Sequence, residues 1–294
     1  MAPVLKALQP LTLLTILLAQ ILAGYFLGFS NSWSEVFNFN HLLVYTSSVL
    51  IGAFGFLFDF ASNGKSENQP VDSSEKQIAG RIMILSLFLA CTGLLTGFLF
   101  SFRLGNYLTF TFAIIVLQVL FFKKWPVIGV IISSLLAAAP FLILIPFDIN
   151  LKINLVLLFA VYSFGIQFLI SLINDALNVE SDNLRNYRTL SVLAGVRATK
   201  TFMIVIIFLY ILVFTSGVRL VVDNYFTSPL SYIFLAFNLL CIGLPLFHIL
   251  AKLQMSNFQT NYQYLQGVGV YVRIMILLSM LLFRTTRVGS FVVL

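Results

Sequence analysis

The polar residues most able to do chemistry follow directly on a long apolar run. Ile153–Ile173 is long enough to cross a bilayer, and Asp175, Asn178 and Asp182 come just after it. At 100° per residue these three side chains share a helical stripe about 60° wide, whereas Glu180 points to the other side. Two carboxylates and an amide oxygen on one stripe are suitable ligands for a hard cation such as Mg²⁺, which would present a phosphate.

A second acidic helix end follows the apolar run His41–Phe60. Asp59, Asn63 and Glu67 would share a face if the helix continued, although Gly64 weakens that continuation. Two such ends, four apolar runs apart, suggest two halves of one site. The basic residues available to bind a diphosphate beside them are Lys123, Lys124, Arg185, Arg188 and Lys200.

The composition decides which elements position these residues. Hydrophobic residues are 60% of the 294 and charged residues only 9%, far below the roughly 25% of soluble domains. Apolar runs near the length of a membrane span recur along the chain. They are Leu11–Gly28, His41–Phe60, Ile78–Phe100, Tyr107–Phe122, Val127–Phe147, Ile153–Ile173, Phe202–Leu220, Leu230–Leu250 and Val268–Phe283. The sequence predicts an all-α, polytopic transmembrane bundle of about nine helices, forming a single domain over residues 1–294.

The net charge of +7 follows this topology and does not indicate nucleic-acid binding. With a cytoplasmic N-terminus, eleven Lys and Arg residues lie on the inner side: Lys6, Lys65, Lys76, Arg81, Lys123, Lys124, Arg185, Arg188, Arg197, Lys200 and Lys252. Five lie on the outer side: Arg103, Lys152, Arg219, Arg284 and Arg287. Arg273, near the start of the last span, is left unassigned. Because positive charge gathers on the inner side, we expect a multi-pass protein of the cytoplasmic membrane with both acidic loops in the cytoplasm.

The segment after the sixth span resembles a known family. Its residues are Asp175-Ala-Leu-Asn178-Val-Glu180-Ser-Asp182 and then Arg188-Thr189-Leu190-Ser-Val-Leu-Ala-Gly195. They resemble the second aspartate-rich motif of UbiA-type intramembrane prenyltransferases, D-x-x-D-x-x-G-D, followed by a basic residue, Thr-Leu-Pro and a Gly-terminated apolar run. Asp175 and Asp182 match the outer acids. Asn178 replaces the middle Asp, Ser181 the usual Gly and Ser191 the usual Pro.

Other parts of the chain agree with the resemblance. The family has nine transmembrane helices, with acidic motifs on the cytoplasmic loops after the second and sixth. Lys123–Gly129 resembles the family's L-K-R-x-x-x-x-G entry into the fifth helix, and Leu8-Gln9-Pro10 resembles its Arg-Pro start. The first motif is degenerate. The family pattern N-D-x-x-D-x-x-x-D falls on Gly55, Phe56, Asp59 and Asn63, so only Asp59 remains an acid.

The resemblance implies Mg²⁺-dependent transfer of a prenyl group from a prenyl diphosphate to a lipophilic acceptor. Asp175, Asp182, Asp59, Asn178 and Asn63 would hold the metal. The diphosphate would be bound by Lys123, Lys124, Arg188 and Lys200.

The degenerate first motif keeps an alternative open. In this alternative, the protein has lost catalytic activity and binds or transports an isoprenoid lipid, or supports another membrane protein. A secondary transporter would need interrupted helices or midplane charges. Pro140 and Pro245 are candidate interruptions, with no intramembrane charge assigned beside them.

Overall fold

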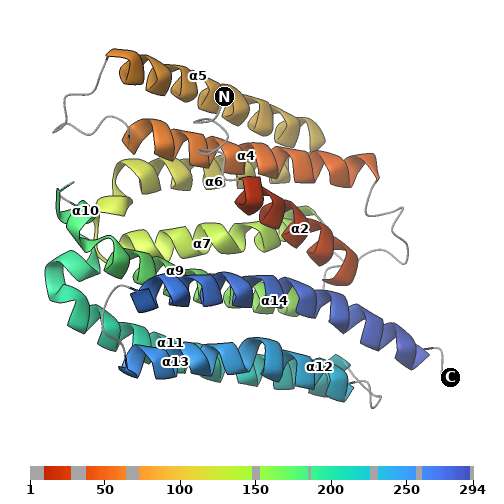
Figure 1. Ribbon diagram of the computed structural model, residues 1–294. Coiled ribbons are helices and arrows are strands. Elements are labelled where there is room, and N and C mark those ends of the chain that lie inside the picture. The colour runs from red at the N-terminus through yellow and green to blue at the C-terminus, as the bar shows by residue number, and fades with distance from the viewer. Residues whose placement is uncertain are drawn as a thin grey trace. The chain divides into compact units, whose positions relative to one another are not determined.

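The described part of the chain consists of helices joined by short connections (Figure 1). This computed structural model describes residues 10–27, 38–63, 73–147, 153–184, 187–225, 231–255 and 260–291. The first helices are α2 (Pro10–Leu27), α4 (Phe39–Asn63), α5 (Ser73–Phe100), α6 (Phe102–Leu120), η1 (Phe122–Lys124), α7 (Ile128–Leu142) and α8 (Leu144–Phe147). The others are α9 (Ile153–Leu177), α10 (Val179–Leu184), α11 (Leu190–Tyr225), α12 (Ser231–Asn238), η2 (Leu239–Gly243), α13 (Leu244–Met255) and α14 (Thr260–Phe291).

Within these ranges, six helices are long and apolar enough to cross a membrane. They are Phe39–Ser62, Gln77–Phe100, Phe102–Leu120, Ile153–Leu177, Leu190–Asp223 and Tyr232–Leu253. Two shorter apolar helices, Thr12–Gly24 and Ile128–Leu142, overlap two more of the predicted spans, and the last predicted span, Val268–Phe283, falls within α14. The predicted all-α membrane bundle is confirmed, and the chain is an integral multi-pass membrane protein.

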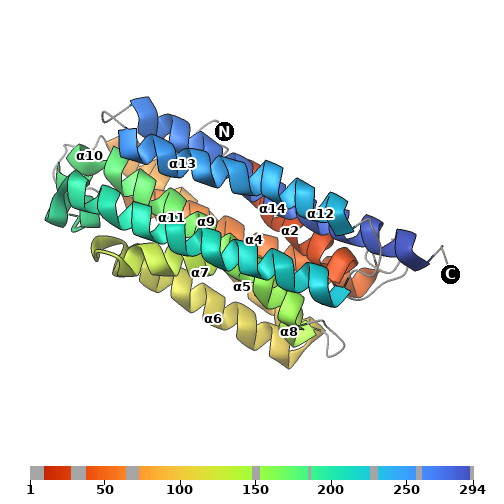
Figure 2. The ribbon, with the colours of Figure 1, turned by 90° about the horizontal axis from the view of Figure 1, so that it is seen from below.

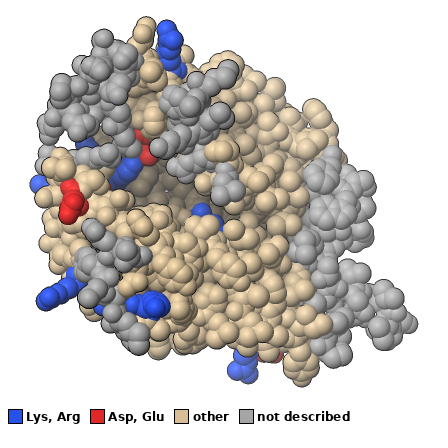
Figure 3. Space-filling model, in the orientation of Figure 1, with Lys and Arg blue, Asp and Glu red and all other residues tan. Residues whose placement is uncertain are grey.

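The surface of these helices suits lipid. Large apolar side chains such as Phe88, Leu99 and Phe110 are exposed on α5 and α6. On the face shown in Figure 3, Lys, Arg, Asp and Glu are few among uncharged residues. Apolar side chains that would be a liability in water are expected where the surrounding solvent is hydrocarbon.

The helices extend beyond the predicted spans, and the loop predicted after the sixth span is largely helical. α9 continues to Leu177 and is followed at once by α10, and α11 begins at Leu190 and not near Phe202. Hydropathy marks only the part of a helix that suits hydrocarbon. A polar turn at the bilayer surface keeps its backbone hydrogen bonds and so remains helical.

Contacts divide the chain into two compact units. The first comprises Met1–Lys123 and Ala139–Leu151, and the second comprises Lys124–Ala138 and Lys152–Leu294. The expectation of one domain over residues 1–294 stays a prediction. Asp59 belongs to the first unit, whereas Asp175 and Asp182 belong to the second.

The first unit is organised around α4, which packs against α2, α5 and α6. Phe54 and Leu57 of α4 are fully buried. The connection from α5 to α6 is tight: the Ser101 side chain accepts a hydrogen bond from the Leu104 amide and caps α6. A Cβ on Gly105 would lie 2.3 Å from the Phe98 ring, so glycine is needed where these two helices meet.

The second unit is organised around α9, which packs against α11 and α14 (Figure 2). Two tyrosines tie α9 to α11: the Tyr162 hydroxyl donates to the Phe214 carbonyl, and the Tyr210 hydroxyl donates to the Tyr162 carbonyl. α12, η2 and α13 form a continuous helical segment with a π-helical stretch in the middle, and Pro245 lies just after that stretch. α9 therefore holds the acidic end of the second unit on a well-packed helix.

Candidate functional site

The acidic end of α9 keeps a helical hydrogen-bond pattern across its break at Asn178. The Asn178 amide donates to the Asn174 carbonyl at 3.0 Å, and the Asp182 amide donates to the Asn178 carbonyl at 2.8 Å. Asp175, Asn178 and Asp182 therefore lie on successive turns, as their spacing predicts. Asp175 and Asp182 are half-buried, whereas Asn178 is exposed.

Asp175 is a half-buried carboxylate with an acidic neighbour. In the part of the chain that the structure describes, no side chain forms a hydrogen bond or an ion pair with it. Asp182 lies near enough for the two negative charges to repel each other. Two carboxylates in these surroundings are unfavourable unless a cation or a proton neutralises one of them.

This donor set fits Mg²⁺ with a diphosphate better than it fits an all-protein metal cage. No cluster of three or more His, Cys, Asp or Glu side chains suited to a metal ion occurs in the described ranges. Mg²⁺ is commonly held by one or two carboxylates, with waters and substrate phosphates completing its coordination. Asp175, Asp182 and the Asn178 amide supply oxygen ligands of the kind that this arrangement uses.

Gly195 shapes the connection that follows. Its φ of 80° and ψ of 159° are conformations that residues with a Cβ rarely adopt, and they kink α11 near its start. The Thr199 hydroxyl donates to the Gly195 carbonyl, and the buried Ser191 hydroxyl donates to Thr199. The predicted Gly-terminated run thus ends at a kink that only glycine suits.

Two of the predicted phosphate ligands meet at this connection. The Arg188 amide donates to the Lys124 carbonyl at 3.2 Å, and both residues are exposed. Lys200 is half-buried one turn into the second part of α11. The second unit therefore brings Arg188 and Lys124 together although they are 64 residues apart in sequence.

In the first unit, the predicted metal ligand Asp59 and the predicted phosphate ligand Lys123 bind each other. The Lys123 ammonium lies 2.7 Å and 3.0 Å from the two carboxylate oxygens of Asp59. Their side chains are 33% and 38% exposed, respectively. Asn63 is the last residue of α4, and its side chain lies outside the described residues.

The rest of the first motif is apolar in its packing as well as in its sequence. A Cβ on Gly55 would lie 3.2 Å from Ile115 of α6, so this position is closed by a neighbouring helix. Phe54, just before it, packs against Phe58 and Phe112 with ring centroids 5.2 Å and 4.9 Å away. Asp59 is thus the acid that this end of α4 provides.

Arg273, which the predicted topology leaves unassigned, lies beside the middle of α9, a helix long and apolar enough to span a membrane. Its guanidinium, on α14, donates a hydrogen bond to the Gln167 side-chain carbonyl near the middle of α9. The Gln167 amide donates to the Ser171 hydroxyl, which is 3.2 Å from the hydroxyl of Ser133 on α7. The helical spacing of Gln167 and Ser171 on α9, and of Asn178 just after its end, is the signal that points to this site.

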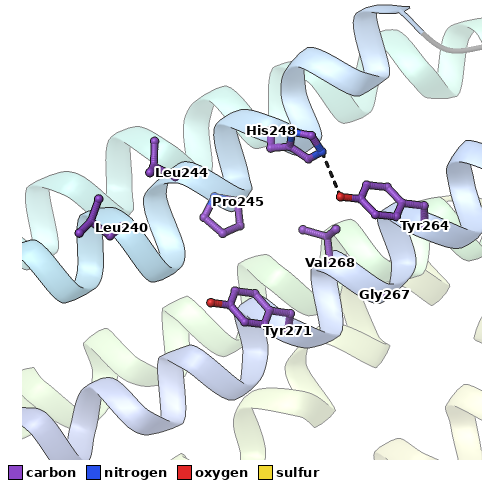
Figure 4. Close-up of a pocket in the computed structure, with 8 residues that line it drawn as sticks. All are labelled: Leu240, Leu244, Pro245, His248, Tyr264, Gly267, Val268 and Tyr271. Atoms are coloured by element: carbon purple, nitrogen blue, oxygen red, sulfur yellow. Dashed lines mark hydrogen bonds between the residues drawn. The ribbon is translucent and has the colours of Figure 1, made fainter.

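A groove of about 620 Å³ lies between the η2–α13 segment and α14 (Figure 4). It is mainly apolar, and His248 and Tyr264 close one end of it, with His248 Nε2 3.2 Å from the Tyr264 hydroxyl. His248 of α13 therefore has a side-chain partner on α14. This groove lies apart from the acidic end of α9 along the chain and shares no residue with it.

Solved structures with a similar fold are known. A digeranylgeranylglyceryl phosphate synthase superposes with a TM-score of 0.67 at 14% identity, over 91% of this chain and 92% of that chain. A UbiA homologue from Archaeoglobus fulgidus, bound to DMAPP and Mg²⁺, gives a TM-score of 0.66 at 15% identity, over 95% and 98%. An apo UbiA homologue from Aeropyrum pernix K1 gives a TM-score of 0.62 at 11% identity, over 92% of this chain and 98% of that chain. The chain has a UbiA-type fold.

Sequence comparison adds nothing to this structural likeness: no protein-family model and no curated protein sequence matches the chain. At identities of 11–15%, the chemistry of this UbiA-type fold must be argued from its own residues. Those residues are the acidic end of α9 in the second unit and the Asp59–Lys123 pair in the first.

Proposed function

We propose that the protein transfers a prenyl group from a prenyl diphosphate to a lipophilic acceptor within the membrane, with Mg²⁺ as cofactor. The observation that carries the proposal is the half-buried Asp175 carboxylate, close to Asp182 and without a partner in the described part of the chain. It lies at the end of a membrane-spanning helix in a UbiA-type fold. The homologue from Archaeoglobus fulgidus binds DMAPP and Mg²⁺, and another structure of it holds GPP and Mg²⁺.

In this proposal, Asp175 and Asp182 would each hold Mg²⁺, with the Asn178 amide between them on the stripe, and bound Mg²⁺ would supply positive charge to the diphosphate leaving group. The exposed Lys124 and Arg188 bind the diphosphate oxygens, and Lys200 adds positive charge nearby. The carbon–oxygen bond of the allylic diphosphate breaks and its electron pair leaves with the diphosphate. The apolar surroundings then keep water from the allylic cation until the acceptor attacks it.

Asp59 can hold a metal ion only if Lys123 moves away from it or leaves one carboxylate oxygen free. In the structure Lys123 neutralises Asp59, so this end of α4 presents an ion pair with no net charge. Two acidic side chains at the same place would bind a cation more strongly. We propose Lys123 as a diphosphate ligand and Asp59 as a metal ligand, as the sequence predicts; the side chain of Asn63, the other metal ligand predicted at this end of α4, lies outside the described residues.

The test uses purified protein, a radiolabelled prenyl diphosphate, Mg²⁺ and a panel of lipophilic acceptors. We expect a labelled lipid product with the wild type, and none with Asp182→Ala or in the presence of EDTA. Glu180→Ala is the matched control, because Glu180 is an exposed acid off the stripe and should keep full activity. No labelled product from any acceptor would refute prenyl transfer.

The degenerate first motif favours a second candidate function, in which the protein binds or transports an isoprenoid lipid, or supports another membrane protein, without chemistry. Its support is the Asp59–Lys123 pair and the closed position of Gly55. Calorimetry in detergent separates the two candidates. Diphosphate binding that needs no Mg²⁺ and survives Asp175→Asn would favour this second function.

We also propose that both acidic ends face the cytoplasm, in the cytoplasmic membrane, because eleven of the Lys and Arg residues fall on that side of the predicted topology. Single cysteines at exposed Glu180 and exposed Arg103 test the orientation. In a variant without Cys91 and Cys241, an impermeant maleimide added to intact cells should label Arg103→Cys and leave Glu180→Cys unlabelled. The reverse pattern would overturn the orientation.

A further inference from the structure

A polar stripe runs along α9 from its acidic end into the membrane-spanning part. Gln167, Ser171, Asn174 and Asn178 fall within about 60° of one another on the helix. The stripe extends over about 16 Å of the helix axis. It ends at Gln167, near the middle of a helix long and apolar enough to span a membrane. Polar groups at that depth are costly unless they bind each other or a ligand.

Arg273 lies at the inner end of this stripe. The guanidinium has five N–H donors, and it donates to the Gln167 carbonyl oxygen. No Asp or Glu of the described ranges forms an ion pair with it, and Gln167 is its one hydrogen-bond acceptor there. Arg273 is half-buried. A full positive charge is thus held inside the helices by a neutral amide, with most of its donors left for another partner.

Gln167 is itself held in place. Its amide group donates to Ser171, whose hydroxyl lies 3.2 Å from that of Ser133. The amide nitrogen is therefore turned toward Ser171, and the carbonyl oxygen is turned toward Arg273. This arrangement fixes the guanidinium without neutralising it, as expected of a binding group prepared for an anion.

We propose that Arg273 and Gln167 form a binding site for the oxyanion of an amphiphile, a carboxylate or a phosphate attached to a hydrocarbon chain. A guanidinium pairs with either group through two parallel hydrogen bonds. The neighbouring side chains on α14, Val272 and Ile276, are buried and apolar, and Ile170 of α9 packs close to Gly269. The residues beside the guanidinium are therefore apolar, which suits an anion attached to a hydrocarbon chain better than a free, strongly hydrated anion.

This site is distinct from the acidic end of α9. Gln167 is eight residues before Asp175, about 12 Å along the helix axis. The acidic end needs a cation, whereas Arg273 needs an anion, so one ligand group cannot serve both. The inference does not rest on prenyl transfer, and it stands whether or not the protein is an enzyme.

The competing explanation is that Arg273 merely ties α14 to α9 through Gln167. Gln167→Glu separates the two roles. The new carboxylate would pair with Arg273, strengthen the tie between the helices and occupy the guanidinium. A purely structural role therefore predicts unchanged ligand behaviour with Gln167→Glu, whereas a binding role predicts that the anion is displaced.

The experiment measures binding to the purified full chain in an uncharged detergent at neutral pH. The probes are dodecanoate, a lysophosphatidic acid and, as the neutral control, dodecanol. We expect the wild type to bind at least one of the two anions more tightly than dodecanol. The two anionic probes tell a carboxylate ligand from a phosphate ligand. Arg273→Gln and Gln167→Glu should each lower the affinity for the preferred anion roughly 10- to 100-fold, as the loss of a charged hydrogen bond implies.

Arg219→Gln is the matched control. It removes one positive charge from an 84% exposed side chain on α11 and should leave the affinity unchanged. Gel filtration and circular dichroism establish folding, and Gln167→Glu remains informative even if Arg273→Gln does not fold. Three results would overturn the site: dodecanol binding as tightly as both anions, neither anion binding the wild type, or Gln167→Glu binding with wild-type affinity.

Discussion

Replacing Asp175 by Asn should change the stability of the protein in opposite directions with and without Mg²⁺. Without a divalent cation, Asp175 is a half-buried carboxylate beside a second acid, Asp182. Asparagine has nearly the same shape and no charge, so it removes this repulsion. With Mg²⁺ and pyrophosphate, the same substitution removes a ligand, and the stabilisation by binding should be lost.

The size of the first effect follows from helix geometry. Asp175 and Asp182 are seven residues apart, which is about 10 Å along a helix. Two unit charges at about 10 Å repel each other by about 1.7 kcal/mol at an effective dielectric constant of about 20. Salt screens part of this repulsion. We therefore expect Asp175→Asn to raise the free energy of unfolding by about 1 kcal/mol, or the apparent Tm by roughly 2 °C. In the wild type, ligand at about 100 times its Kd would add about 2.7 kcal/mol.

The assay is thermal unfolding in detergent, in EDTA and then in Mg²⁺ with pyrophosphate. In EDTA the order of Tm should be Asp175→Asn above wild type, and in Mg²⁺ with pyrophosphate the order should reverse. Glu180→Gln is the matched control, because it removes one negative charge from an exposed residue of α10 outside the stripe. It should follow the wild type in both buffers.

Two results would refute this reasoning. A lower Tm of Asp175→Asn in EDTA would mean that the carboxylate has a stabilising partner. An equal rise of Tm with Mg²⁺ and pyrophosphate in the wild type and in Asp175→Asn would show that the cation site, if there is one, lies elsewhere.

Two further predictions concern the structure around the site. A double-mutant cycle of Asp59→Asn and Lys123→Gln, measured by unfolding, should give a coupling energy of about 0.5 kcal/mol, because both side chains are about one third exposed. The coupling energy should become smaller in 1 M KCl. A coupling energy above about 2 kcal/mol would contradict this prediction. Gly195→Ala should lower the free energy of unfolding by about 1–3 kcal/mol through backbone strain alone, because no atom lies within 4 Å of the added Cβ. Gly80→Ala is the control, because its added Cβ also meets no atom within 4 Å but lies in the regular helix α5. This control should be neutral or slightly stabilising. Similar losses of stability in both variants would rule out strain at Gly195.

Much of the fold could be predicted from the sequence because lipid imposes a simple rule. A segment that crosses hydrocarbon must be apolar and must satisfy its own backbone, so apolar runs of adequate length are helices. That rule places α4, α5, α9 and α11. It says little about polar turns, which is why α10 and the start of α11 were expected to be loop. Hydropathy identifies what lipid surrounds, and not where a helix ends.

The candidate site was predictable only where its residues are neighbours on one helix. Asp175, Asn178 and Asp182 are related by helical spacing, and the structure keeps that spacing across the break at Asn178. Lys123 and Asp59 are 64 residues apart, and their pairing changes what each can do: a predicted metal ligand and a predicted phosphate ligand neutralise each other. No periodicity in the sequence connects two residues on separate helices.

The sequence by itself determined that this chain is a multi-pass helical membrane protein with an acidic stripe at the end of its sixth span. Both conclusions depend on local properties, namely the apolarity of a segment and the 3.6-residue period of a helix. Only the tertiary structure decided which charges meet. It joined Arg273 to Gln167, 106 residues away, and left Asp175 without a partner in the described ranges. The physical reason is that a charge in an apolar protein acts through whatever lies within a few ångströms of it, and packing brings together residues that are far apart in the chain.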